Sequence, residues 1–129
     1  MLGDKDVVAT LAVKDLDAAR DFYENKLGLN RMDVPNADPE TILYRSGSSA
    51  VLVYRSQYAG TNQATAASWA VGDDIESVIE GLKAKGVSFE HYDLPGATRE
   101  GDVHAFGEMK AAWFKDPDGN ILNIVNQSV

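Results

Sequence analysis

The chain of 129 residues contains no cysteine and only two histidines, His91 and His104. The absence of cysteine excludes disulfides, a thiol nucleophile, and zinc or iron–sulfur sites built on cysteine. Hydrophobic runs long enough to cross a membrane are also missing, and the opening MLGDKD does not resemble a signal peptide. From these features we expect a cytoplasmic protein with no membrane partner.

Positive charge is scarce. The chain has twelve Lys and Arg residues and 20 Asp and Glu residues, which gives a formal net charge of −8. Such a chain repels phosphate backbones and anionic lipid surfaces, so nucleic acid is not an expected partner. The charge weakly favours neutral or cationic ligands, although solubility alone explains it equally well. The length predicts one domain over residues 1–129.

The first half of the chain reads as a strand, a helix and three further strands. Residues 7–13 are β-branched and apolar, which predicts a strand buried on both faces. Asp15 or Asp17 is the candidate N-cap of a helix that Gly28 ends. Its apolar stripe is Leu16, Ala19, Phe22, Tyr23 and Leu27. Strands are expected at residues 29–34, 41–45 and 50–55, and residues 56–65 read as a linker.

The second half repeats this order. We expect a strand at residues 66–71, a helix capped by Asp73 or Asp74 and ended by Gly86, and a strand at residues 87–92. The apolar stripe of this helix is Ile75, Val78, Ile79 and Leu82. Residues 93–107 read as a long loop. The sequence DPDGN at residues 116–120 contains Pro and Gly in turn positions, so it predicts a hairpin between residues 111–115 and 121–125.

The two halves align with each other. The same distance in sequence separates Val13 from Val71 and Gly28 from Gly86. Self-similarity of this kind predicts an internal repeat. We place the first module at residues 5–57 and the second at residues 64–127.

Two segments carry a resemblance to a known family. VKDLDAARDFYENKLGL at residues 13–29 and FKDPDGNILNIV at residues 114–125 resemble the vicinal-oxygen-chelate superfamily. That superfamily includes glyoxalase I, extradiol dioxygenases, methylmalonyl-CoA epimerase and the bleomycin-resistance proteins. The resemblance implies an α+β fold of two tandem βαβββ modules, the glyoxalase/bleomycin-resistance fold. Their sheets form a half-open cup, which a homodimer usually completes.

The resemblance also implies where metal ligands would lie. Metal-using members of the superfamily carry histidine or glutamate at four strand positions, which correspond here to Val8, Leu52, Ala66 and Asn123. Three of these side chains have no donor atom, and Asn123 offers one neutral carbonyl oxygen. A divalent cation needs several convergent imidazole or carboxylate groups. We therefore predict that the protein uses no metal or other cofactor.

The two histidines suggest one alternative metal site. His104 and Glu108 are close in sequence, so together they are a conceivable nonstandard site. The simpler interpretation is that both histidines lie at the surface or in a loop and make local hydrogen bonds.

Alternation along the strands predicts which side chains line the cup. If the metal positions face the cup, so do Thr10 and Ser68. Leu122 and Ile124 then form core, and Trp69 points toward a helix as a core aromatic. Tyr54, Phe106 and Trp113 are candidates for the cup wall, with the core or a dimer interface as equal alternatives. The predicted ligand-binding set is Val8, Thr10, Leu52, Tyr54, Ala66, Ser68, Phe106, Trp113 and Asn123.

Two functions from different classes follow. The first is a metal-free binding protein, similar to the bleomycin-resistance branch, that confers antibiotic resistance by sequestering a bulky drug-like or natural-product molecule in a dimer crevice. The second is an enzyme, with no assigned catalytic residue. It would be a metal-free catalyst, or a lyase, isomerase or dioxygenase that uses Zn, Ni, Mn or Fe on displaced ligands. A third possibility is an interaction or regulatory module.

Overall fold

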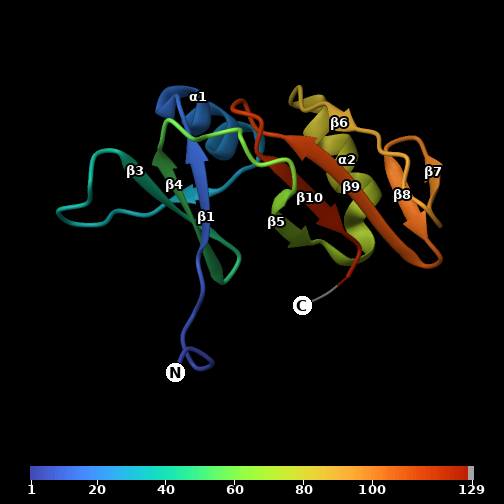
Figure 1. Cartoon of the computed structure of the whole chain (residues 1–129), viewed down its shortest axis with the longest axis horizontal. Helices are drawn as coiled ribbons and strands as arrows, with labels where there is room; N and C mark the ends of the chain where they lie inside the picture. The colour runs from blue at the N-terminus through green and yellow to red at the C-terminus, as the bar shows by residue number, and fades with distance from the viewer. Residues whose placement is uncertain (128–129) are drawn as a thin grey trace.

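A computed structural model describes residues 1–127, which form two mixed β-sheets with helical segments (Figure 1). The first sheet has the order β1-β4-β3-β2, and the second has the order β5-β10-β9-β8-β7, with β6 also paired to β9. The first-sheet strands are β1 (Ala9–Val13), β2 (Asn30–Arg31), β3 (Thr41–Ser46) and β4 (Ser49–Arg55). The second-sheet strands are β5 (Thr65–Ala70), β6 (Phe89–Glu90), β7 (Thr98–Glu100), β8 (Val103–Phe106), β9 (Met109–Lys115) and β10 (Ile121–Val125).

The first helical segment begins as predicted. The Asp15 carboxylate accepts hydrogen bonds from the backbone N–H groups of Asp17 and Ala18, at 2.9 and 3.1 Å, and so caps α1 (Leu16–Arg20). The chain then widens into a π-helix, η1 (Asp21–Lys26). This wider helical turn directs both Phe22 and Tyr23 toward the core, where they are 4% and 0% exposed.

The second helical segment differs from the sequence prediction at its start. A short 3₁₀ turn, η2 (Gly72–Asp74), precedes α2 (Ile75–Ala84), and the Asp74 side chain makes no capping hydrogen bond. The predicted apolar stripe is present, because Ile75, Ile79 and Leu82 are buried and Val78 packs against the same core. None of the helices in the described residues is long and apolar enough to span a membrane.

Several predicted strands are shorter than expected, and one predicted loop is wrong. Residues 7–8 precede β1, whose Thr10 is exposed, so β1 is buried on one face only. Residues 29–34 and 87–92 contribute only two strand residues each. Residues 93–107 are not a loop. They contain the antiparallel pair β7 and β8, joined by a turn at Gly101, which has a φ of 60°.

The hairpin at DPDGN forms as predicted and also joins the two modules. The Asp116 carboxylate accepts hydrogen bonds from Tyr23 Oη of η1 at 2.7 Å and from the backbone N–H of Asn120 at 2.8 Å. Asn120 Nδ2 donates to the Ala12 carbonyl oxygen of β1 at 2.7 Å. The turn therefore ties the second sheet to η1 and to β1, an edge strand of the first sheet, and β1 lies toward β5 of the second sheet (Figure 1).

Two buried tyrosines should make the protein sensitive to alkali. Burial, with the Asp116 carboxylate nearby, raises the pKa of Tyr23 above its ordinary 10.0. Burial and the hydrogen bond to Glu24 likewise raise the pKa of Tyr44 above 10.0. Each folded-state pKa lies above the unfolded value. The resulting stability is therefore full below about pH 10 and is lost as the pH rises above that value.

We expect the free energy of unfolding to fall above about pH 10, by roughly 1.4 kcal/mol per pH unit for each buried tyrosine. Urea denaturation between about pH 9 and pH 11 measures this slope. Tyr44→Phe should flatten it, whereas Tyr58→Phe, which changes a residue that is 71% exposed, should not. The same slope in both variants would contradict the assignment.

Candidate functional site

The face of the second sheet turned away from α2 carries a row of polar and aromatic residues. Asn123 of β10 lies opposite Ser68 of β5 on one side and opposite Trp113 of β9 on the other. Trp113 is in turn paired with Glu90 of β6. Because paired residues share a face, these four side chains line one surface. We call this surface the concave face of the second sheet.

A cluster of three rings covers part of the concave face. The imidazole of His104 meets the indole of Trp113 edge-on, with ring centroids 5.0 Å apart. Tyr92 also meets Trp113 edge-on at 5.5 Å and lies 6.1 Å from His104. We call Tyr92, His104 and Trp113 the aromatic cluster. Edge-to-face contacts of this kind hold each ring in a defined orientation.

The prediction that His104 lies at the surface or in a loop is wrong. The residue is 0% exposed, because it lies on β8 opposite Ala111 of β9. Its Nε2 atom accepts a hydrogen bond from the Tyr92 backbone N–H at 2.9 Å. The neutral ring therefore carries its proton on Nδ1, and this buried N–H has no partner in the described chain. His91 fits the expectation, since it is exposed and its Nε2 bonds to Asp102 at 2.7 Å.

Trp113 reaches across β10. Its indole Nε1 donates to Thr65 Oγ1 on β5 at 3.1 Å, although Trp113 itself lies on β9. β10 lies between these two strands, so the indole passes over it next to Asn123. This position explains why Asn123 is only 5% exposed although its neighbour Ser68 on β5 is exposed.

Asn123 is a buried amide with an unused oxygen. Its Oδ1 atom has no hydrogen-bond partner in the described chain. An unsatisfied buried acceptor costs roughly 1–3 kcal/mol, and native folds rarely leave one without a function, a water or a ligand. Asn120, three residues earlier, shows the opposite case, because its side chain donates two hydrogen bonds.

The four positions that the family resemblance implies for metal ligands do not suit a divalent cation here. Val8 precedes β1 and is 40% exposed, Leu52 lies on β4, and Ala66 is exposed on β5. None of these three side chains has a donor atom, and Asn123 supplies one neutral oxygen. Glu108 is exposed, unlike the buried His104. Among the described residues, no three His, Cys, Asp or Glu side chains come together in a way that could hold a metal.

The other predicted site residues lie on both halves of the cup. Thr10 is exposed and bonds to the Val8 carbonyl at 3.2 Å, and Tyr54 on β4 is 36% exposed. Ser68 is exposed beside Asn123, and Phe106 is half-buried on the same face of β8 as His104. Trp69 packs against the core from the helix side, as predicted, with its Nε1 donating to Ser46 Oγ at 2.9 Å.

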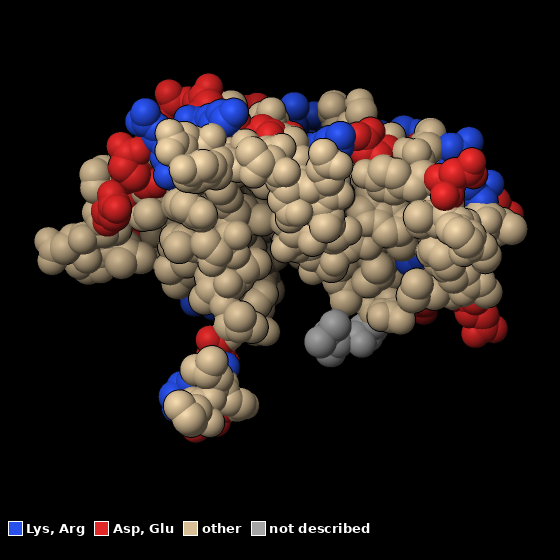
Figure 2. Space-filling view, viewed as in Figure 1, with Lys and Arg blue, Asp and Glu red and all other residues tan. Residues whose placement is uncertain are grey.

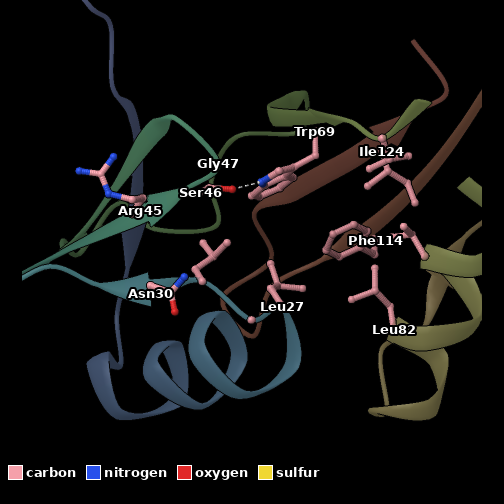
Figure 3. Close-up of a pocket in the computed structure, with 13 residues that line it drawn as sticks. Leu27, Asn30, Arg45, Ser46, Gly47, Trp69, Leu82, Phe114 and Ile124 are labelled. Atoms are coloured by element: carbon pink, nitrogen blue, oxygen red, sulfur yellow. Dashed lines mark hydrogen bonds between the residues drawn. The ribbon is translucent and has the colours of Figure 1, made fainter. Parts of the chain in front are cut away.

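Two hollows lie close to these residues, and neither is lined by Asn123 or Trp113. The first, of about 280 Å³, lies between the modules beside Leu27, Trp69, Leu82 and Phe114, and we call it the junction cleft (Figure 3). Its walls are mainly apolar, and the guanidinium of Arg45 points away from Trp69 and Phe114 (Figure 3). The second, of about 510 Å³, is largely polar, and we call it the histidine hollow. It is lined by residues 91–94, 97–99 and His104.

Charge is distributed unevenly over the surface. On the face that Figure 2 shows, acidic and basic side chains gather along one edge and at the ends, whereas the middle of this face carries little charge. The N-terminal residues project from the body, with Met1 and Leu2 112% and 80% exposed. The middle of this face therefore offers a neutral surface.

Comparison with solved structures finds the same fold in several proteins of low sequence identity. UcmS2 superposes with a TM-score of 0.73 at 14% identity, covering 98% of this chain and 100% of its own. A glyoxalase/bleomycin resistance protein/dioxygenase from Alicyclobacillus acidocaldarius gives 0.68 at 20% identity, with 97% and 93% covered. The fosfomycin resistance protein FosX from Listeria monocytogenes, complexed with Mn(II) and sulfate, gives 0.69 at 14% identity, with 100% and 94% covered.

These similarities establish the fold, and a match to a family profile establishes the superfamily to which the chain belongs. No curated protein matches the chain. The profile described as the Glyoxalase/Bleomycin resistance protein/Dioxygenase superfamily matches residues 6–124, which is nearly the whole chain. The two sheets and few helices agree with that fold. The chain belongs to the Glyoxalase/Bleomycin resistance protein/Dioxygenase superfamily.

Proposed function

We propose that this protein binds a small organic molecule on the concave face of the second sheet and does so without a metal ion. The observation that carries the proposal is the unpartnered Oδ1 of buried Asn123 beside the indole of Trp113. A ligand that shifts the Trp113 indole, stacks on it and donates a hydrogen bond to Asn123 would satisfy this acceptor. A few fixed polar groups in an otherwise apolar or neutral wall are typical of small-molecule sites.

The chemistry of the donor set favours binding over metal-dependent reaction. FosX from Listeria monocytogenes was solved with Mn(II), and it shares this fold at 14% identity. In this chain the family positions hold Val8, Leu52, Ala66 and Asn123, which together offer one neutral oxygen. We therefore derive no reaction step through a metal. The bleomycin-resistance type of function, in which the protein sequesters its ligand, needs no such step.

A second copy of the chain completes the proposed site. Tyr54, Thr10 and Ser68 are exposed on the open cup, so a ligand bound to one chain alone would stay largely in water. A homodimer that closes the cup would bury a bulky, drug-like or natural-product ligand on both sides. The net charge of −8 is compatible with a neutral or cationic ligand.

Trp113 provides a direct test of ligand binding. In the Trp69→Phe background, Trp113 is the remaining tryptophan of the chain, so its fluorescence reports on the concave face. Bleomycin and a panel of planar heteroaromatic compounds are suitable first probes, with fosfomycin as a small, non-aromatic comparison. We expect saturable quenching by at least one planar compound, together with a higher melting temperature.

The matched control is Asn30→Ala, which makes the same change at an exposed asparagine on β2 of the first sheet, outside the concave face. It should change the affinity of the quenching compound by less than about threefold, whereas Asn123→Ala should weaken it by about tenfold. Equal effects of the two variants, or quenching that never saturates, would refute the proposed site.

A further inference from the structure

The histidine hollow is bordered by His104 and Arg99, whose Nδ1–H and guanidinium take part in no hydrogen bond or ion pair within the described chain. It lies beside the aromatic cluster, with which it shares Tyr92 and His104, and its wall includes neither Asn123 nor Trp113. We propose that this hollow is an oxyanion site, which binds the carboxylate or phosphate group of a small molecule through His104 Nδ1–H and the guanidinium of Arg99. The inference rests on the hollow itself, so it stands or falls separately from the proposed function.

The first donor is fixed by the hydrogen bond on the other side of the imidazole. Because Nε2 of His104 accepts from the Tyr92 backbone N–H, a neutral ring must present an N–H at Nδ1. That atom has almost no exposed surface and no partner within the described chain, and the residue that carries it borders the hollow of about 510 Å³. Buried donors are almost always satisfied, so an acceptor is expected to occupy this space.

The second donor is a cation adjacent to the first. Arg99 of β7 lies directly opposite His104 of β8, so the two side chains share a face of the hairpin. Arg99 is exposed and lines the same hollow. Among the described residues it takes part in none of the ion pairs, which use other basic side chains. A guanidinium presents paired N–H groups that match the two oxygens of a carboxylate or phosphate.

The acidic residues nearby leave room for an anion. Both carboxylate oxygens of Asp102 are engaged, one by Lys83 at 2.8 Å and one by His91 at 2.7 Å. Lys83, with His91 as a further hydrogen-bond partner, holds the pKa of Asp102 below its usual value. Asp93 is the carboxylate that lines the hollow, and it is exposed to solvent, where water screens its charge. The hollow is large enough for an oxyanion together with part of the molecule that carries it.

The test uses inorganic phosphate and acetate as probes of the full chain. Both are titrated at constant ionic strength, and the side-chain ¹⁵N and ¹H resonances of His104 are followed by NMR. We expect a saturable shift of the Nδ1–H signal with at least one anion. Arg99→Gln should weaken that binding about tenfold, because it removes a charge-assisted hydrogen bond. Tighter phosphate binding would indicate a phosphorylated ligand, and tighter acetate binding a carboxylic acid.

Arg45→Gln is the matched control, since Arg45 is also exposed and outside the ion pairs but lies on β3 of the first module. Its effect on the anion affinity should be less than about twofold. Two results would overturn the proposal. One is the absence of any saturable shift at about 50 mM of either anion. The other is the same loss of affinity in Arg99→Gln and Arg45→Gln, which would indicate a general charge effect.

Discussion

Replacing Asp116 by alanine is expected to lower the free energy of unfolding by about 3–5 kcal/mol. Asp116 is 5% exposed, and its carboxylate accepts hydrogen bonds from Tyr23 Oη, from Asn120 Nδ2 and from two backbone N–H groups. Alanine would leave these buried donors without an acceptor. It would also release the turn that links β10 to η1 and, through Asn120, to β1. Urea denaturation near neutral pH, followed by circular dichroism, measures the loss.

Asp118→Ala is the control, because it removes the same charge from the same turn. Oδ2 of Asp118 is buried without a hydrogen-bond partner in the described chain. Its removal should therefore change the free energy of unfolding by no more than about 1 kcal/mol, in either direction. Similar losses in Asp116→Ala and Asp118→Ala would show that the turn depends on its charge rather than on the Asp116 hydrogen bonds.

Replacing Asn123 by leucine is expected to separate stability from function. Leucine has the same branched shape and has no acceptor to leave unsatisfied, so the free energy of unfolding should rise by about 1–2 kcal/mol. Ligand binding should fall at least about tenfold, because the hydrogen bond to the amide is lost. Urea denaturation gives the first quantity, and quenching of Trp113 gives the second.

Asn120→Leu is the matched comparison, since both asparagines are buried next to or within β10. The Asn120 side chain is fully used as a donor, to Ala12 and Asp116, so its replacement should cost about 2–3 kcal/mol. If Asn123→Leu instead destabilised the fold by a similar amount, Asn123 would be a structural residue and the concave face would lose its main polar anchor.

The sequence predicted those parts of the fold that depend on local pattern. The Asp15 cap, the apolar stripes of both helices and the DPDGN hairpin are each encoded within a few neighbouring residues. Alternation along β10 also placed Leu122 and Ile124 in the core, where they are 0% and 2% exposed. The fold class followed from the internal repeat and the family resemblance.

The sequence did not predict the burial of His104 and Asn123, because this burial depends on contacts between segments that are far apart along the chain. His104 is buried because β8 pairs with β9 at Ala111, and its tautomer is set by the backbone of Tyr92. The alternation of Val103, His104, Ala105 and Phe106 was the available signal, but Gly101 and Gly107 on either side made the segment read as a loop. The burial of Asn123 likewise depends on an indole that reaches across a strand from Trp113 to Thr65.

Metal content measures most directly whether the concave face binds its ligand without a divalent ion. The protein is purified without a metal-affinity step, dialysed, and examined by mass spectrometry for Zn, Ni, Mn and Fe. Because Val8, Leu52, Ala66 and Asn123 supply one neutral oxygen between them, we predict far less than one equivalent of any of these metals per chain. One tightly held equivalent per chain, lost in Asn123→Leu, would contradict the metal-free site.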